Sequence, residues 1–384
     1  MQKAVEAVNS YNHNLPLAIH IKQYCRLHKA MGSRDRKFLQ QLVFQYFRLN
    51  NAINAKSIED KIAIAHILCN DFPDDFYNYW FEKLDLSDNL KIKGVSNKLK
   101  IAKELNLFNG MQAQFPMVEK ISSEIDSASF LNSCLTQPYT WIHCKRKQID
   151  TVKTEFHDLG IEYITTEKSE TALGFNKYID FSQMTTFQKG FFEVQDLSSQ
   201  LTGTLFQPEQ QQNWWDCCAA SGGKSLLLKD IEPSVKLWAT DSRATIIENL
   251  KTRLKKASTT NYETAVLDLE HQQPEFNINF DGIILDAPCT GSGTWSRNPE
   301  RMTSFQKNEI DVYAEKQFKI ANRVAPFLKP DGKLIYITCS VYKQENEENI
   351  KRIAENNHLN IQRMQYFKGY EYNADSMFAA LLTQ

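Results

Sequence analysis

The chain has 384 residues, of which 42% are hydrophobic and 24% are charged, proportions typical of a globular protein. No apolar run reaches the roughly 20 residues that a membrane-spanning helix needs, so we expect no membrane segment. The formal net charge of −1 excludes the strongly basic proteins whose charge alone identifies a nucleic-acid binder.

The eight cysteines do not predict a metal site. No two of them have the C-x-x-C spacing of zinc sites, so we expect no metal. Residues 1–10 lack the basic stretch, apolar core and cleavage site of a secretory signal. This favours the cytoplasm, where thiols stay reduced. We expect the protein to be a monomer.

Helical periodicity dominates the first third of the chain. From Leu15 to Leu49, apolar residues recur at spacings of three and four, the period of helices that bury one face. Further helical patterns cover Ile58–Leu68, Asp75–Leu84 and Val118–Ile125, with polar breaks between them. We therefore predict a helical domain over residues 1–135.

The pattern then changes to a mixture of strands and helices. Trp141–Cys144, Tyr163–Thr165 and Phe192–Val194 have the character of strands, and Gln148–Leu159 has that of a helix. We predict a small α/β module, RRM-like in pattern, over residues 136–190.

After residue 190, short apolar runs that end in Asp or Cys alternate with helical segments. These runs are Asn213–Cys218, Lys236–Asp241, Glu263–Asp268, Phe280–Asp286 and Lys333–Cys339. The alternation implies right-handed βαβ units, and so a doubly wound, Rossmann-like α/β domain over residues 191–384. In such domains ligands bind at the carboxyl ends of the strands, where these Asp and Cys residues lie.

The first chemical signal is a small-residue loop after the first of these strands. It consists of Cys218, Ala219, Ala220, Ser221, Gly222, Gly223 and Lys224. Small residues let the backbone approach a ligand closely, and the predicted helix Ser225–Asp230 offers unpaired N–H groups at its start. The end of the loop is similar to a P-loop, but the first glycine of that motif falls on Cys218, which argues against an NTPase.

Two acidic residues at later strand ends extend this predicted ligand site. Asp241 lies about twenty residues past the loop, where a carboxylate can accept hydrogen bonds from both ribose hydroxyls. This position suits a cofactor that contains adenosine. Asp268 either lines the adenine side of the same crevice or serves as a turn residue.

Two thiols also stand at strand ends. Asp286 is followed by Pro288, Cys289 and a glycine loop that can fold over a planar substrate, and Cys339 ends a later strand. A lone Cys in a strand is most often a small buried hydrophobe, but two thiols beside one cofactor loop favour a chemical role.

Methylation of cytosine at carbon 5 is a reaction in which two thiols can each perform a separate step. Carbon 5 accepts a methyl group only after a thiolate has added to carbon 6. The carbon 5 proton must then leave and the thiol must be expelled, which gives a second acid/base group a task. Asp286 can bond the ring nitrogen and the exocyclic amine of the base.

These motifs resemble those of the RsmB/Sun family of S-adenosylmethionine-dependent RNA cytosine-5 methyltransferases, from about residue 140 to the end of the chain. The family elements are C-A-A-P-G-G-K, D-A-P-C-S-G-x-G, and T-C-S followed by E-N-E. Their counterparts here are Cys218–Lys224, Asp286–Gly293, Thr338–Ser340 and Glu345–Glu347. Phe192–Gln200 and Arg297–Glu300 resemble two further family elements.

The resemblance implies a role for each matching residue. Cys339 would be the nucleophile, and Cys289 would assist release. The loop Cys218–Lys224 with Asp241, Asp268 and Asp286 would line the pocket for S-adenosylmethionine and the base. The implied substrate is RNA with a flipped or single-stranded target, ribosomal RNA in the first place and transfer RNA in the second.

The chain departs from the family pattern at two positions. Ser221 replaces the usual Pro of the loop, which should loosen the turn without removing backbone donors. Ile246 stands where the family generally has Arg, so either Arg243 compensates or the contact is absent. Gly32–Arg36 resembles a fragment of the NusB-like domain, which suggests RNA docking by the first domain.

Other interpretations stay open. The basic clusters Lys145–Lys147 and Lys251–Lys256 either contact phosphate or are solvated surface. A methyltransferase for protein side chains or adenine amines shares the fold, although adenine enzymes usually show N/D-P-P-Y/F where this chain has Asp286–Cys289. A catalytically inactive RNA-binding assembly factor is a further alternative, against which the intact thiols argue.

Overall fold

The computed structural model describes all residues, 1–384, and the chain divides into two compact units. The first, the helical unit, consists of Met1–Glu119, Asp126–Gln137 and Trp295–Lys307. The second, the α/β unit, consists of Lys120–Ile125, Pro138–Thr294 and Asn308–Gln384. No helix of the chain combines the length and the apolar character that crossing a bilayer requires.

The helical unit contains nine α-helices, most of them in the first third of the chain. They are α1 (Gln2–Asn9), α2 (Leu17–Leu27), α3 (Ser33–Leu49), α4 (Ile58–Cys69), α5 (Asp75–Lys83), α6 (Val95–Glu104), α7 (Met111–Gln114), α8 (Ser127–Ser133) and α14 (Arg301–Ser304). The apolar positions of α1 to α4 pack into one core, as their spacing predicts. The predicted helical character of this region is therefore confirmed.

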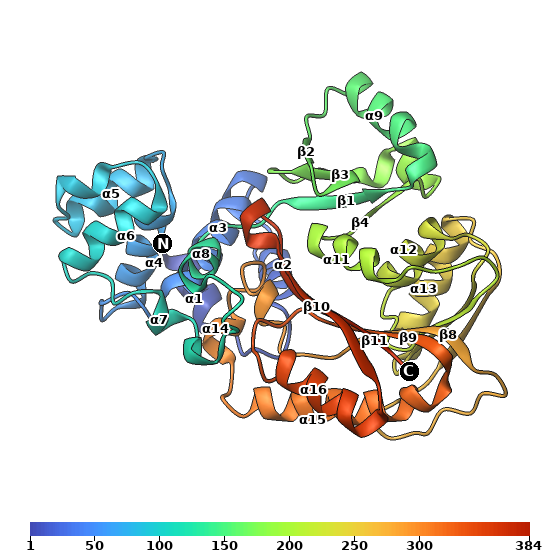
Figure 1. Cartoon of the computed structure of the whole chain (residues 1–384). Helices are drawn as coiled ribbons and strands as arrows, with labels where there is room; N and C mark the ends of the chain where they lie inside the picture. The colour runs from blue at the N-terminus through green and yellow to red at the C-terminus, as the bar shows by residue number, and fades with distance from the viewer. The chain divides into compact units, whose positions relative to one another are not determined.

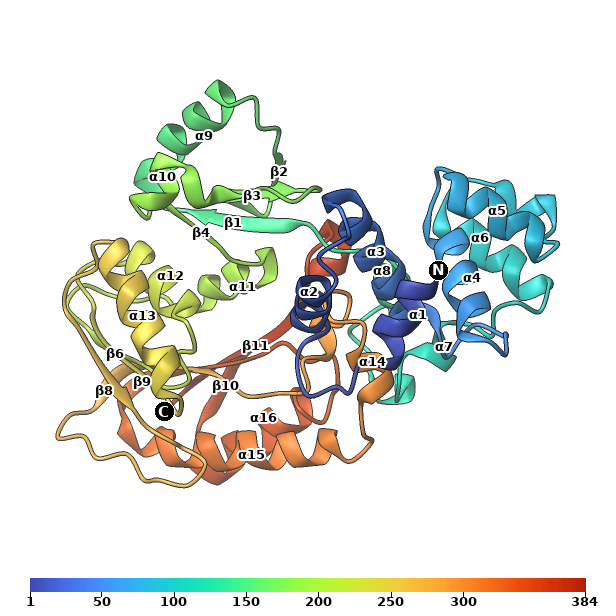
Figure 2. The same cartoon turned by 180° about the vertical axis from the view of Figure 1, so that it is seen from behind.

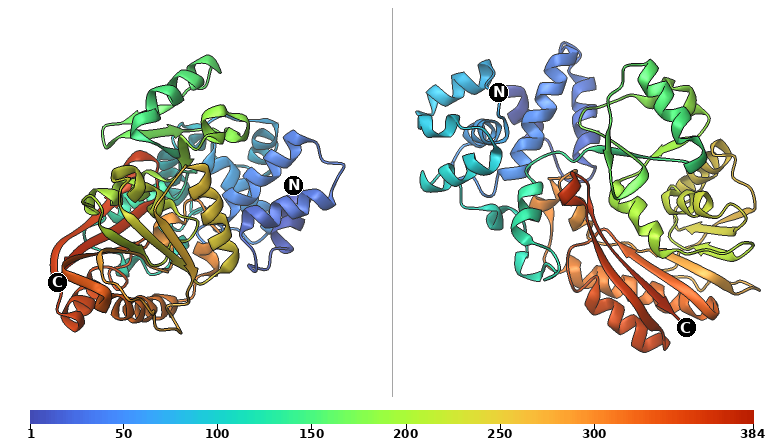
Figure 3. Two further views of the ribbon diagram at one scale, coloured as in Figure 1. Left: turned by 90° about the vertical axis from the view of Figure 1, so that its right-hand side faces the viewer. Right: turned by 45° about the horizontal axis from the view of Figure 1, so that its top comes forward.

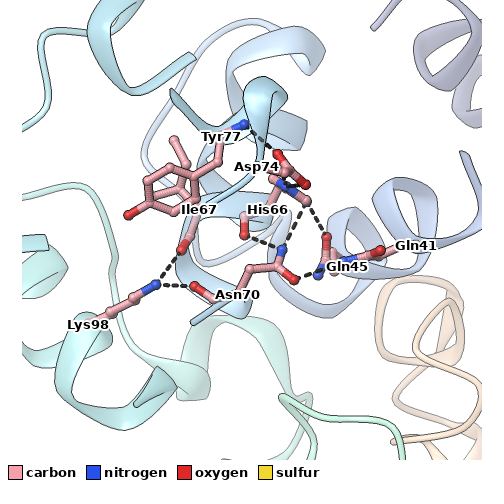
Figure 4. Close-up of polar contacts among 8 residues, drawn as sticks. All are labelled: Gln41, Gln45, His66, Ile67, Asn70, Asp74, Tyr77 and Lys98. Atoms are coloured by element: carbon pink, nitrogen blue, oxygen red, sulfur yellow. Dashed lines mark hydrogen bonds and ion pairs between the residues drawn. The ribbon is translucent and has the colours of Figure 1, made fainter. Parts of the chain in front are cut away.

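Buried polar contacts hold α4 against its neighbours, as Figure 4 shows. The Nδ1 atom of His66 lies 3.0 Å from Gln45 Oε1 in α3, and its Nε2 atom lies 3.2 Å from the carboxylate of Asp74. Lys98 in α6 donates to the carbonyls of Ile67 and Asn70, which lie at the end of α4. A buried cation thus satisfies carbonyls that the helix itself leaves unpaired.

The predicted helix at Val118–Ile125 is wrong. Only Val118–Lys120 forms a short 3₁₀ turn. Ile121 instead makes an isolated antiparallel bridge to Tyr342, and the Ser122 N–H donates to the Val341 carbonyl at 3.0 Å. Because these groups bond to a distant segment, they are not available for the hydrogen bonds of a helix.

The α/β unit contains a four-stranded antiparallel sheet, the small sheet. Its order is β2 (Ile164–Thr166), β3 (Ser169–Phe175), β1 (Thr140–Cys144) and β4 (Phe192–Val194). Helix α9 (Ile149–Asp158) packs on one face of this sheet, where Phe156 enters its core (Figure 3). Strand β3 was not predicted, and its Gly174 lies against the ring of Trp141, where a side chain would collide.

The larger sheet has seven strands in the order β10, β11, β9, β8, β5, β6, β7. Their bounds are β5 (Asn213–Asp216), β6 (Lys236–Asp241), β7 (Tyr262–Val266), β8 (Phe280–Asp286), β9 (Leu328–Thr338), β10 (Asn360–Lys368) and β11 (Ser376–Thr383). Strands β9, β8, β5, β6 and β7 are parallel, and β11 and β10 extend them in antiparallel fashion. The predicted doubly wound α/β fold is confirmed.

Helices cover both faces of this sheet. Figures 1 and 2 show α12 (Gly223–Ile231) and α13 (Ala244–Lys256) on one face, and α15 (Glu309–Val324) and α16 (Glu347–Asn357) on the other. Strand β5 has β6 on one side and β8 on the other, so the chain changes direction across the sheet at this point. Ligands of doubly wound sheets bind at such a switch point, beyond the carboxyl ends of the strands.

Candidate functional site

The small-residue loop leaves β5 and turns sharply into α12. Ala220 and Gly222 have positive φ angles of 45° and 92°. A Cβ atom on Gly222 would lie 2.2 Å from the side chain of Leu250, so the position accepts only glycine. The Ala219 N–H donates to the Thr240 carbonyl at 2.8 Å, which fixes the loop against β6. The N–H groups at the start of α12 therefore follow directly on a tight turn.

The segment Phe192–Gln200 borders this loop. It contains β4 and the short helix α11 (Leu197–Leu201). Gln195 donates to the Gly223 carbonyl at 3.2 Å, and Lys224 donates to the Ser199 hydroxyl at 2.7 Å. The loop and the segment that resembles the family's lead-in are thus joined by hydrogen bonds.

Lys224 also connects the loop to the predicted base pocket. Its ammonium group is buried and donates to Asp286 Oδ2 at 3.0 Å. About a third of the Asp286 side chain is exposed. The ion pair of Lys224 and Asp286 thus links the loop after β5 to the end of β8.

Asp216 is a buried acid directly before the loop. Its Oδ2 accepts a hydrogen bond from Ser225 at 2.6 Å, and its Oδ1 has no partner. Burial raises the pKa of Asp216 to about 7, and the negative charge of Asp286 adds to this effect. The sequence places Asp216 at the start of this motif but predicts no role for it.

Asp241 lies at the end of β6, and all its acceptor positions are taken. Oδ1 accepts from the backbone N–H and the Nε of Arg243, and Oδ2 accepts from Arg243 Nη2 and the Ala220 N–H, at 2.9 to 3.1 Å. Four hydrogen bonds fill the four lone-pair positions of a carboxylate. Burial raises the pKa of Asp241, but the contacts with Arg243 lower it by more. The pKa therefore lies below its ordinary value.

Arg243 therefore fills acceptor positions of Asp241, the carboxylate that we expect to bind a ribose. Its side chain is 59% exposed, so it can turn toward solvent when a ligand enters. Ile246 stands where the family generally has Arg. It lies near the start of α13 and is partly exposed. Because Arg243 donates to Asp241 in this arrangement, the geometry does not show it in the place of the family's Arg.

Asp268 has a different environment. It lies two residues beyond β7, and its carboxylate accepts from the Glu270 N–H at 3.0 Å and contacts His271 at 2.8 Å. The hydrogen bond with His271 lowers the pKa of Asp268. These bonds stay within one turn, which is the role of a turn residue. The structure does not connect Asp268 with the loop Cys218–Lys224.

The two predicted thiols are neighbours. Cys289 follows β8, Cys339 follows β9, and their Sγ atoms lie 3.3 Å apart. Both are free and partly exposed. The hydrogen bond with Cys339 and burial raise the pKa of the Cys289 thiol well above its ordinary value. Cys289 is thus a thiol that keeps its proton at neutral pH in this arrangement.

Gly293 brings the two thiol loops together. Its N–H donates to the Cys339 carbonyl at 2.8 Å. A Cβ atom on Gly293 would lie 2.1 Å from the Ser376 carbonyl oxygen and 3.0 Å from that of Cys339. The glycine of the loop is therefore required by close packing of the backbone.

A buried carboxylate binds both thiol loops. Glu345 is fully buried and accepts from the N–H and the hydroxyl of Thr290, next to Cys289, at 2.9 and 2.5 Å. It also accepts from the hydroxyl of Ser340, next to Cys339. Burial raises the pKa of Glu345, although its hydrogen bonds lower it in part.

A second layer of buried polar residues completes this network. Gln317 in α15 donates to Glu345 at 2.9 Å and to the Pro288 carbonyl at 2.9 Å, and it accepts from Tyr336 at 2.8 Å. Asn346 accepts from Thr338 at 2.5 Å. Sequence reasoning missed Gln317, because a helical Gln has no distinctive pattern, and it assigned no role to Tyr336, three residues before Cys339.

The element Arg297–Glu300 lies in the helical unit rather than with the thiols. Glu300 is buried there and accepts a hydrogen bond from the Leu17 N–H at the start of α2, at 3.1 Å. Nearby, Trp295 packs on Phe115 with a ring separation of 5.0 Å. This motif therefore contributes to the packing of the helical unit.

Comparison with known proteins relates residues 203–382 to the family described as 16S rRNA methyltransferase RsmB/F. Ribosomal RNA small subunit methyltransferase B of Shewanella oneidensis is 36% identical over 175 residues, which cover 44% of this chain and 40% of the relative. The protein of that name from Photorhabdus laumondii is 30% identical over 225 residues, 57% of this chain and 52% of the relative. The chain thus spans about half the length of the curated relatives it matches.

Solved structures show the same fold over a larger part of the chain. The crystal structure of PH0851 has a TM-score of 0.74 at 20% identity and covers 100% of this chain and 99% of its own. That of NSun6 from Pyrococcus horikoshii, solved with SFG, has a TM-score of 0.63 at 16% identity and covers 70% and 98%. At these identities the likeness shows the fold alone.

Proposed function

Residues 203–382 belong to the RsmB/F family of methyltransferases, and from this premise we propose that the chain methylates carbon 5 of a cytosine in RNA. The methyl donor in this proposal is S-adenosylmethionine. The observation that carries the proposal is the pair of thiols, Cys289 and Cys339, with sulfur atoms 3.3 Å apart beyond two adjacent parallel strands. Two thiols at this distance can act on one ring.

The loop after β5 fits an adenosine-bearing cofactor. Its positive φ angles at Ala220 and Gly222 form a concave turn, and the N-terminus of α12 follows at once. Asp241 faces the same turn through its bond to the Ala220 N–H, so its carboxylate can receive a ribose once Arg243 has moved. When bound, the cofactor supplies an electrophilic methyl group.

Cys339 is the nucleophile in this proposal. As a thiolate it adds to carbon 6, and the electron pair of the C5–C6 double bond then makes carbon 5 nucleophilic. Asp286, held by Lys224, bonds the ring nitrogen and the exocyclic amine of the base. After methylation the carbon 5 proton leaves, the C6–S bond breaks and the thiolate of Cys339 is regenerated.

Cys289 assists the second half of the reaction. Once Cys339 is bonded to carbon 6, its hydrogen bond to Cys289, which raises the pKa of Cys289, is lost, and Cys289 as a thiolate takes the carbon 5 proton. The electron pair of the C5–H bond re-forms the C5–C6 double bond as the C6–S bond breaks. Glu345 keeps both thiol loops at a fixed distance through Thr290 and Ser340. In this proposal attack and release therefore belong to different sulfur atoms.

The two basic clusters support RNA as the substrate. Lys145 donates to the Ala257 carbonyl at 2.6 Å, which places the cluster Lys145–Lys147 beside the last turn of α13 and its cluster Lys251–Lys256. Lys147 and Lys255 are exposed. Cations gathered from two segments attract a phosphate backbone more strongly than either run alone. Ribosomal RNA is the favoured substrate and transfer RNA the alternative, with RNA docking by residues 1–135.

Methyl transfer from labelled S-adenosylmethionine tests this proposal. Purified protein is incubated with ribosomal RNA or with transfer RNA, and the RNA is then digested to nucleosides. We expect label in 5-methylcytidine from ribosomal RNA. Label in another nucleoside, or none while the cofactor binds, would refute the proposed activity, and the second result would favour an inactive RNA-binding factor.

A further inference from the structure

Ser221, which replaces the usual Pro of the cofactor loop, has a partner of its own. Arg253 in α13 donates through Nη1 to the carbonyl and to the hydroxyl of Ser221, the latter at 2.7 Å. Through Nη2 it donates to the carboxylate of Glu193 in β4. One guanidinium group therefore joins the loop, α13 and the small sheet.

The surroundings of Arg253 favour a fixed side chain. The side chains of Arg253 and Glu193 are only 27% and 18% exposed. Glu193 pairs with His143 across the small sheet, so its backbone is held by strand pairing. A guanidinium that makes contacts with both nitrogen atoms of its fork has little freedom left. The cofactor loop is thus hydrogen-bonded to a side chain, that of Arg253, which is itself held in place.

The contacts of Arg253 restrict the conformation of the loop at the position where the family pattern has proline. Proline restricts φ and so reduces the number of conformations that a loop must give up when it binds a ligand. Serine brings no such restriction. Ser221 lies between Ala220 and Gly222, both with positive φ, in a turn that unrestrained residues leave easily. Hydrogen bonds to both the carbonyl and the hydroxyl of Ser221 hold the turn instead.

We propose that Arg253 is a positioning residue for the cofactor loop and performs through Ser221 the function that proline has in the family pattern. This inference rests on the proposed function, since it takes the ligand of the loop to be S-adenosylmethionine. It assigns a role to a residue of the basic cluster on α13 that differs from contact with phosphate. The pairing of Ser221 with Arg253 compensates a departure of this chain from the family pattern.

Calorimetry with S-adenosylhomocysteine, using the full chain, tests the proposal without relying on activity. Arg253→Met keeps the apolar stem and removes all donors, and we expect affinity to fall about tenfold from the lost charge-assisted bonds. Arg253→Lys retains the charge opposite Glu193 but not the fork, so an intermediate loss is expected. Thr252→Ala, an exposed neighbour on the same helix, is the matched control and should bind like the wild type.

Ser221→Pro provides the decisive comparison. Combined with Arg253→Met, it should restore most of the affinity that Arg253→Met loses. Hydrogen exchange at residues 220–223 should slow in the double variant relative to Arg253→Met. Unchanged affinity of Arg253→Met and Arg253→Lys would overturn the inference, and so would failure of Ser221→Pro to rescue the affinity of Arg253→Met. A wild-type protein that does not bind at all would instead refute the proposed cofactor.

Discussion

Glu345 accepts two hydrogen bonds from Thr290, one from its backbone N–H and one from its hydroxyl, although fifty-five residues separate them in the chain. Thr290 directly follows Cys289, and the Ser340 hydroxyl that also donates to Glu345 directly follows Cys339. A single buried carboxylate is therefore a common anchor for the two thiols. The distance between the sulfur atoms depends on a residue that contacts neither of them.

Replacement of Glu345 should affect catalysis and stability together. Glu345→Ala removes the shared buried acceptor of Thr290, Ser340 and Gln317, so we expect a loss of about 3 kcal/mol in the free energy of unfolding. Turnover should fall while affinity for the cofactor changes little. Urea denaturation and methyl-transfer assays measure these effects. Glu348→Gln, an exposed neighbour, is the control and should change neither quantity.

Asp241 and Arg243 should differ in their effect on the cofactor. Asp241→Ala removes the ribose acceptor, so affinity should weaken by about 1–3 kcal/mol. Arg243→Ala frees the carboxylate that Arg243 occupies, so affinity should stay the same or increase. Calorimetry distinguishes these results. If Arg243→Ala weakens binding as much as Asp241→Ala, Arg243 itself contributes to the site.

The basic clusters should determine how RNA binding depends on salt. Lys147→Ala combined with Lys255→Ala removes two exposed cations, one from each cluster. If both contact phosphate, the slope of log affinity against log salt should fall by about 1.4, at about 0.7 per contact with single-stranded RNA. The double variant Lys319→Ala and Lys351→Ala removes two exposed cations from α15 and α16 as a control. Equal slopes for both double variants would assign the clusters to solvated surface.

The polar network of the helical unit should make its stability depend on pH. Burial lowers the pKa of His66 below its ordinary value of 6.5, although Asp74 raises it in part. Below pH 6.5 the unfolded chain therefore binds more protons than the folded chain, and stability falls as the pH decreases. This stability is fully present above pH 6.5.

Urea denaturation of wild type and His66→Gln between pH 5 and pH 8 isolates this effect. We expect the stability advantage of the wild type over the variant to shrink as the pH falls through and below 6.5. His157→Gln, at an exposed position, should show no such trend relative to the wild type. A constant difference between wild type and His66→Gln would contradict the assignment.

Motifs next to strand ends allowed much of the site to be predicted from sequence. The strands Lys236–Asp241 and Phe280–Asp286 have the predicted bounds, because each is a short apolar run that ends in an acid. The loop Cys218–Lys224 and the two thiols likewise lie beyond strand ends.

What the sequence did not reveal depends on contacts between distant segments. Gln317 and Tyr336 join the network around Glu345 only after α15 has packed beside β9. The segment Val118–Ile125 has a helical apolar pattern, yet Ile121 pairs with Tyr342 far along the chain. No local pattern predicts such pairings, because the two partners lie on different elements of the fold.

The assignment of the nucleophile is tested most directly by comparing Cys339→Ala with Cys289→Ala on labelled RNA in the presence of S-adenosylmethionine. Denaturing gels report the covalent protein–RNA adduct. Cys339→Ala should form no adduct and should methylate at background level, because the attacking sulfur is gone. Cys289→Ala should attack but release slowly, so the adduct should accumulate. An adduct with Cys339→Ala and none with Cys289→Ala would mean that the nucleophile is Cys289 and would contradict the account.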